Sequence, residues 1–124
     1  MFDLDPEEAR LLLKIAMMAI GRNRFGSAAR ILAVLERFRP DQASIACTNV
    51  IALISAHKFQ AAVDYIDAEA LRRFPDSAML KAFKGMALMR MNRNDEAGEV
   101  LAEAAQADSD PIAAKLAGDL LGEA

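Results

Sequence analysis

Residue types that mark several protein classes are scarce in this sequence. In 124 residues it has one cysteine, one histidine, no tryptophan and six dispersed glycines. A single cysteine, Cys47, forms no internal disulfide, and one cysteine with one histidine cannot supply the usual ligands of a zinc site. Dispersed glycines also exclude a glycine-rich phosphate loop. We therefore expect no metal, no cofactor and no enzyme activity.

Long apolar runs and clustered basic residues are missing as well. The longest apolar run near the N-terminus, Ile15 to Ile20, is far shorter than the roughly 20 residues of a membrane-spanning helix. The stretch before it is acidic where a secretory signal is basic. Net charge is −3, and the 15 Lys and Arg residues are scattered along the chain. We expect a cytoplasmic protein that neither inserts into a membrane nor binds nucleic acid.

The remaining composition favours helices. Hydrophobic residues make up 54% of the chain, enough for a buried core, but only 6% are aromatic. Alanine, leucine and methionine dominate, which favours helices packed through small residues over a sheet. The sequence predicts one all-α domain over residues 1–124.

One pattern occurs three times along the chain. Each copy passes from a polar turn into a helix with a small residue early on: "GRNRFGSAARIL" (21–32), "SAHKFQAAVDYI" (55–66) and "RMNRNDEAGEVL" (90–101). The small residues Ala28, Ala62 and Ala97 lie 34 and 35 residues apart.

Two further sets of residues recur at nearly the same sequence interval. Pro40 and Pro75 close the second helices, and compact residues lie midway along the first helices at Ala16, Val50 and Gly85. Features that stay in register at a period near 34 indicate a stack of helical pairs.

Capping signals place the first helices. The residues "DPEE" at 5–8 combine a capping carboxylate, a first-turn proline and a glutamate three residues after the cap, so a helix is expected from there to about Gly21. Asn23 lies in the turn that follows. Gly26 or Ser27 then starts the second helix.

The same signals recur later in the chain. Asp41 and Asp76 directly follow the two prolines and are predicted to cap the next two first helices. Asp110 and Pro111 start a final helix, over 112–122. The spacing of its apolar residues suits a helix that covers the open end of a stack. These residues are Ile112, Leu116, Leu120 and Leu121.

A helix, turn, helix and closing proline at this period resemble the tetratricopeptide repeat. The resemblance implies three degenerate helical hairpins, at about 9–42, 43–77 and 78–111, in a right-handed superhelix with a capping helix at 112–122. The sequence departs from the family pattern where large aromatic residues are usual in the first helices. Those positions hold Leu12, Ala46, Lys81, Ala19, Leu53 and Leu88.

In this family the first helix of each pair lines the concave face, which implies a partner-binding groove. By register the groove positions include Arg10, Ser44, Ala82 and Arg90, and the residues predicted to bind the partner are Leu13, Met17, Ile20, Cys47, Ile51, Ile54, Met79, Met86 and Met89. Flexible methionines can re-pack around an apolar helix. The alternative interpretation is that the same stripe is ordinary core or a self-association surface.

Related domains that bind acidic chaperone tails use a clamp of Lys, Asn and Arg on this face. The matching positions here are mostly apolar, which favours an apolar ligand. The stretch "LERFRPDQASIACTNVIALISAHKFQAAVDYI" (35–66) is similar to the needle-subunit chaperones of bacterial type III secretion, the YscG and PscG kind. That resemblance implies a groove that holds the amphipathic C-terminal helix of a needle subunit and prevents polymerisation. It also implies a small helical co-chaperone on the N-terminal repeat.

Other functions fit the same residues. The chain is also consistent with a self-associating scaffold or with an adaptor whose client lies outside secretion. His57 is interpreted as a solvated turn residue and Cys47 as a small hydrophobe, since neither has catalytic or metal-binding partners in the sequence. The acidic pairs fall at helix ends, where capping and the helix dipole explain them.

Overall fold

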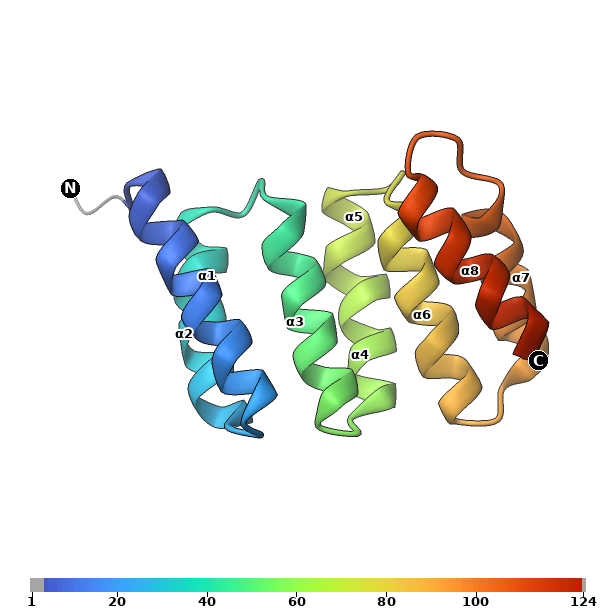
Figure 1. Ribbon diagram of the computed structural model, residues 1–124, viewed down its shortest axis with the longest axis horizontal. Helices are drawn as coiled ribbons and strands as arrows, with labels where there is room; N and C mark the ends of the chain where they lie inside the picture. The colour runs from blue at the N-terminus through green and yellow to red at the C-terminus, as the bar shows by residue number, and fades with distance from the viewer. Residues whose placement is uncertain (1–3, 124) are drawn as a thin grey trace. The chain divides into compact units, whose positions relative to one another are not determined.

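The described part of the chain folds into helices joined by short turns. The computed structural model describes residues 4–123, and within them it contains no strand. In chain order the helices in Figure 1 are α1 (Pro6–Gly21), α2 (Phe25–Phe38), α3 (Ala43–Ser55), α4 (Phe59–Tyr65), η1 (Ile66–Ala70), α5 (Leu71–Arg73), α6 (Ala78–Arg90), α7 (Asn94–Ala105) and α8 (Pro111–Glu123). The predicted all-α helical repeat is confirmed.

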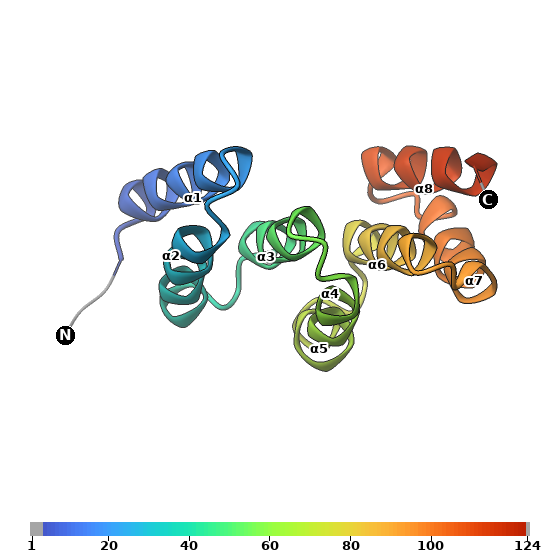
Figure 2. The ribbon, with the colours of Figure 1, turned by 90° about the horizontal axis from the view of Figure 1, so that it is seen from below.

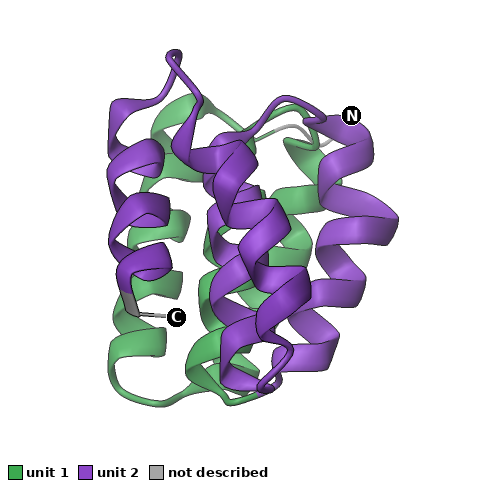
Figure 3. Cartoon of the chain, turned by 90° about the vertical axis from the view of Figure 1, so that its right-hand side faces the viewer, with its two compact units in different colours: residues 1–57 green, residues 58–124 purple. Residues whose placement is uncertain are grey.

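The chain divides into two compact units, which Figure 3 colours separately. Unit 1 (residues 1–57) contains α1, α2 and α3, and unit 2 (residues 58–124) contains the helices from α4 to α8. The division falls within the expected second repeat, between its two helices. The expectation of one domain over the whole chain stays a prediction.

The turn inside each helical pair has the same backbone geometry. Asn23, His57 and Asn92 have φ angles of 61°, 60° and 61°, in the left-handed region that side-chain-bearing residues rarely adopt. The residue after each of them precedes the second helix with ψ between 63° and 65°; these residues are Arg24, Lys58 and Arg93. Because these positions keep the spacing of 34 and 35, the sequence repeat is also a backbone repeat.

The first hairpin begins as predicted. The Asp5 carboxylate accepts a hydrogen bond from the Glu7 backbone N–H at 3.0 Å, and α1 runs to Gly21. The second helix begins at Phe25, slightly earlier than the predicted Gly26 or Ser27.

The predicted caps at Asp41 and Asp76 are wrong. Each proline occupies the second position of a four-residue turn, closed by hydrogen bonds from Gln42 N–H to Arg39 C=O and from Ser77 N–H to Phe74 C=O. The aspartate after the proline therefore lies inside the turn, and the helix starts one residue later. Ser77 caps α6 by accepting from Leu80 N–H at 3.2 Å, whereas Gln42 makes no side-chain cap bond.

The second helix of the middle repeat contains a π-helical turn, η1, between α4 and α5. Each second helix has two fully buried residues after its early alanine. In the first and third repeats these two residues are three positions apart, whereas in the middle repeat they are four positions apart. The pairs are Leu32 and Leu35, Leu101 and Ala104, and Ile66 and Ala70. A π turn takes up one extra residue while keeping both positions on the buried side. This accounts for the step from 34 to 35 residues.

The last helix packs only partly through the residues expected, of which Leu120 is buried and Ile112 is not. In Figure 2, α8 lies against α6 and α7, and both contacts are extensive. The buried side chains of α8 are Ala113, Ala117 and Leu120, while Ile112 is 75% exposed. Leu116 and Leu121 are half-buried. The two fully buried residues are alanines, which let the helix axes approach closely, and Leu120 completes the buried face.

Candidate partner-binding site

The predicted groove residues lie on the first helices, α1, α3 and α6. Most of them are neither fully buried nor fully exposed. The half-buried ones are Leu13, Cys47, Ile51, Ile54, Met79, Met86 and Met89. Met17 is 53% exposed, and Ile20 is 9% exposed and belongs to the core. Met17 is therefore the predicted groove residue most open to a partner, and Ile20 the least.

In unit 1 the groove residues come from α1 and α3, which contact each other directly. Leu13 of α1 and Ile51 of α3 pack against the buried cluster that contains Ala16, Leu32 and Ile45. Their inner sides are thus anchored in the core. The exposed parts of Leu13 and Ile51 are apolar, and Met17 lies one turn beyond Leu13 on α1.

In unit 2 the groove residues come from α6 alone. Its buried residues include Leu80, Ala87 and Leu88, so the helix is held firmly in the core. Met79, Met86 and Met89 retain partial exposure. Three half-buried methionines on one rigid helix form an apolar strip that can adapt its shape to a ligand.

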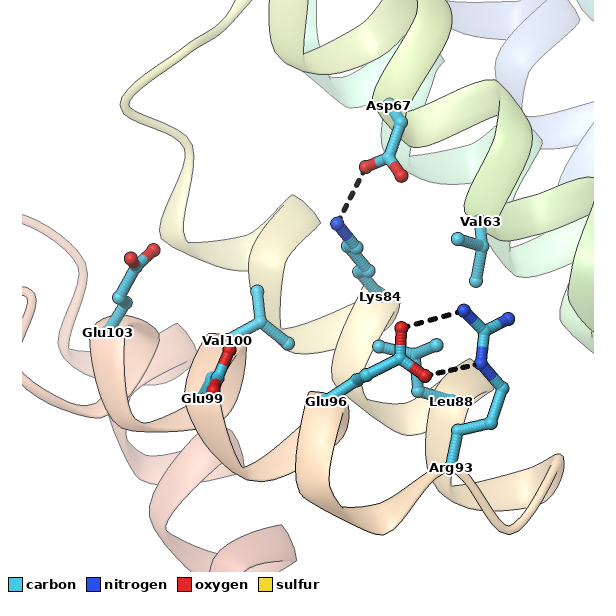
Figure 4. Close-up of a pocket in the computed structure, with 9 residues that line it drawn as sticks. All are labelled: Val63, Asp67, Lys84, Leu88, Arg93, Glu96, Glu99, Val100 and Glu103. Atoms are coloured by element: carbon cyan, nitrogen blue, oxygen red, sulfur yellow. Dashed lines mark hydrogen bonds and ion pairs between the residues drawn. The ribbon is translucent and has the colours of Figure 1, made fainter.

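Sequence reasoning missed a polar pocket in unit 2. Figure 4 shows it between α4, η1, α6 and α7, with a volume of about 300 Å³. Its lining residues are Val63, Asp67, Lys84, Leu88, Arg93, Glu96, Glu99, Val100 and Glu103.

Ion pairs account for much of the polar lining of this pocket. Lys84 Nζ lies 2.8 Å from Asp67 Oδ1, which ties α6 to η1. Arg93 binds Glu96 through two hydrogen bonds, at 2.6 and 2.8 Å, and donates a third to Gln60 Oε1 at 3.0 Å. The sequence offered a signal only for the Arg93 and Glu96 pair, which are three residues apart; Lys84 and Asp67 meet through the tertiary fold.

The Arg93 and Glu96 pair affects both ionisation equilibria. Hydrogen bonding from Arg93 lowers the pKa of Glu96 below its ordinary 4.5, and the same bond raises the pKa of Arg93. Both groups are exposed to solvent, so the pair orients side chains at the start of α7 and contributes little to stability.

The histidine and the cysteine weighed in the sequence lie on different elements of the fold. His57 is exposed in the turn before α4, and Cys47 is half-buried on α3. Across residues 4–123, no group of three or more His, Cys, Asp or Glu side chains is placed to hold a metal ion. In the same part of the chain, none of the helices combines the length and apolar character needed to span a bilayer.

Comparison with known proteins agrees with the helical repeat. Residues 47–111, more than half of the chain, match the tetratricopeptide repeat family. The matched segment covers most of the second and third predicted repeats. No curated protein matches the chain significantly.

Proposed function

Because the chain belongs to the tetratricopeptide-repeat family and is therefore a protein–protein interaction module, we propose that it is a cytoplasmic chaperone of type III secretion. Its inner face holds an apolar amphipathic helix of a needle subunit or a similar secreted subunit, and so prevents premature polymerisation. The repeat is a non-catalytic scaffold, and the protein acts by binding alone.

The observation that carries this proposal is the partial exposure of apolar side chains on the first helices. Met17 is 53% exposed, and Leu13, Ile51, Met86 and Met89 are half-buried. An apolar surface of this kind fits the apolar stripe of an amphipathic helix.

The energetics are sufficient for reversible sequestration. A subunit that buries an apolar helical stripe in a filament exposes that stripe before assembly. Covering five or six of its side chains contributes on the order of 10 kcal/mol gross, at about 1.5–3 kcal/mol each, before the cost of ordering is subtracted. Tight but reversible binding is therefore attainable.

The resemblance to needle-subunit chaperones also implies a second partner. This is a small helical co-chaperone on the N-terminal repeat, and a three-protein complex of equal stoichiometry is its expected signature.

Co-purification from the native cell tests the proposal. We expect mass spectrometry to identify a small helical secreted subunit, and light scattering to give equal stoichiometry. Recovery of the protein by itself would favour the scaffold, and recovery of a client unrelated to secretion would favour the adaptor. Either result would overturn the chaperone function.

Two adjacent methionines of α1 provide a matched pair of variants. Met17→Glu places a charge on the inner face and is expected to abolish capture of the subunit. Met18 is as exposed, at 58%, but lies about 100° further round the helix, so Met18→Glu is expected to retain capture. Far-UV circular dichroism checks that both variants keep their helices.

A further inference from the structure

The outer side of α1 carries an exposed apolar stripe that the groove does not use. Leu11, Ile15 and Met18 are 59%, 48% and 58% exposed. Glu8 precedes them by one turn and Arg22 follows by one turn, and both are exposed. These five residues, spaced alternately by three and four, are called the outer seam of α1. Residues with this spacing line one side of a helix, as they do in a helix that packs lengthwise against another helix.

Repeat symmetry identifies two positions of the outer seam, Leu11 and Met18, as stacking positions. The positions equivalent to Leu11 are Ile45 in α3 and Leu80 in α6, which are 1% and 0% exposed. The positions equivalent to Met18 are Ala52 and Ala87, which are 8% and 0% exposed.

Ile45 shows what these positions normally contact. It lies in the same buried cluster as Leu32 and Leu35 of α2, the second helix of the preceding pair. Within residues 4–123 no helix precedes α1, so the equivalent side chains of α1 have nothing stacked on them. Terminal repeats of such stacks need a polar outer face or a cover.

We propose that a second copy of the chain covers the outer seam, with the two α1 helices packed antiparallel about a two-fold axis near Ile15. Charge complementarity favours this occupant. The seam is acidic at one end and basic at the other, so antiparallel pairing sets Glu8 of each copy against Arg22 of the other. Leu11 then faces Met18 of the other copy, and the two Ile15 side chains meet at the axis. Each contact occurs twice, as a two-fold interface requires.

Neighbouring residues of α2 and of the turn before it widen the surface. Ile31 and Arg24 line a hollow of about 230 Å³ together with Ile15, Met18 and Arg22. Val34 of α2 is a further exposed apolar side chain, at 44%. The exposed apolar area therefore extends from α1 onto α2. A stable interface buries more area than a single helical seam provides.

The dimer and the proposed function use different sides of α1. Leu13 and Met17 lie towards the inner face, and the outer seam lies on the opposite side of the helix. The inference does not rest on the chaperone proposal, since pairing through the outer seam leaves the inner face open.

Sedimentation equilibrium of the full chain tests the pairing. We expect a concentration-dependent dimer. Glu8→Arg or Arg22→Glu alone is expected to weaken it about tenfold, because each creates two like-charge contacts, and the double variant is expected to restore it. Restoration requires the antiparallel register. A monomer at every concentration, or a double variant that stays weak, would overturn the proposal.

Cross-linking tests the position of the axis. Under mild oxidation Ile15→Cys is expected to form a disulfide-linked dimer, identified by mass spectrometry of the linked peptides. In Met18→Cys the two new thiols lie about 10 Å apart along the helices, beyond the reach of a disulfide, so no link through position 18 is expected. The wild-type chain, with Cys47 alone, is the blank. A link through position 18 instead of 15 would contradict the register.

The methionine pair separates this inference from the proposed function. Met18→Glu is expected to abolish the dimer and Met17→Glu to retain it, the reverse of their effects on subunit capture. A co-chaperone that binds the outer seam of a chain that is monomeric by itself would overturn the dimer and leave the chaperone function standing.

Discussion

Gly85 of α6 lies directly against the side chain of Leu101 of α7, so closely that a methyl group at position 85 would overlap Leu101 Cγ and Cδ2. Leu101 is 0% exposed, and side chains in a close-packed interior have little room to shift. Gly85 occupies the repeat position of Ala16 and Val50. The missing side chain thus sets how closely the two helices of the third repeat pack.

Gly85→Ala is expected to destabilise the protein by about 1–3 kcal/mol, because overpacking a tight helix contact costs more than the gain in helix propensity. Gly98→Ala, in α7, is the matched control. A methyl group there meets no atom within 4 Å, so the change is expected to stabilise by about 0.5–1 kcal/mol. Urea denaturation gives both free energies of unfolding. Equal effects would show that the Leu101 contact does not set the cost.

Deleting Ala68 from η1 is expected to preserve the fold. The deletion reduces the spacing of Ile66 and Ala70 from four to three, the spacing of Leu32 and Leu35, so the π turn closes as a regular α-helix. We expect the free energy of unfolding to change by less than about 1 kcal/mol, apart from any loss of the Asp67 and Lys84 ion pair.

Deleting Ala33 from α2 is the control for this experiment. It reduces the spacing of Leu32 and Leu35 to two, which turns one of them away from the core, and we expect a loss of more than about 3 kcal/mol. Circular dichroism and thermal unfolding compare the two deletions. An unfolded Ala68 deletion would show that the π turn is needed in its own right.

Glu96→Gln is expected to lower stability at neutral pH and to have no effect at low pH. The folded-state pKa of Glu96 is lowered by the hydrogen bond from Arg93, so the carboxylate stabilises the fold above its unfolded pKa. This contribution is lost as pH falls below 4.5 and through the folded-state pKa. The effect is small, since the pair is exposed.

A pH series of urea unfolding curves measures this dependence. Glu99→Gln, one turn along α7, is the control, because Glu99 forms no ion pair among the described residues. A Glu96→Gln deficit that persists unchanged at low pH would contradict the assignment.

Local sequence signals predicted much of the fold correctly. The cap at Asp5, the turn at Asn23 and the start of the last helix at Asp110 depend on neighbours within four residues, so they are readable along the chain. The cap at Asp76 was misplaced by one residue, because the turn after Phe74 uses both the proline and the aspartate.

The candidate site was less predictable. Apolar periodicity placed nine groove residues on the first helices, but it did not distinguish the buried Ile20 from the exposed Met17. The register did separate Met17, assigned to the groove, from Met18, which has similar exposure but lies on a different side of α1. The polar pocket was missed because Asp67 and Lys84 are far apart in sequence.

By itself, the sequence determined the helices, their period and the positions of their turns, since these follow from composition, capping and spacing over a few residues. Tertiary structure alone decided where the extra residue of the middle repeat is taken up, why position 85 is a glycine and which apolar side chains stay exposed. Those outcomes depend on contacts between helices, often 15 or more residues apart. The burial of a side chain is set by what packs against it, and a linear pattern does not contain that information.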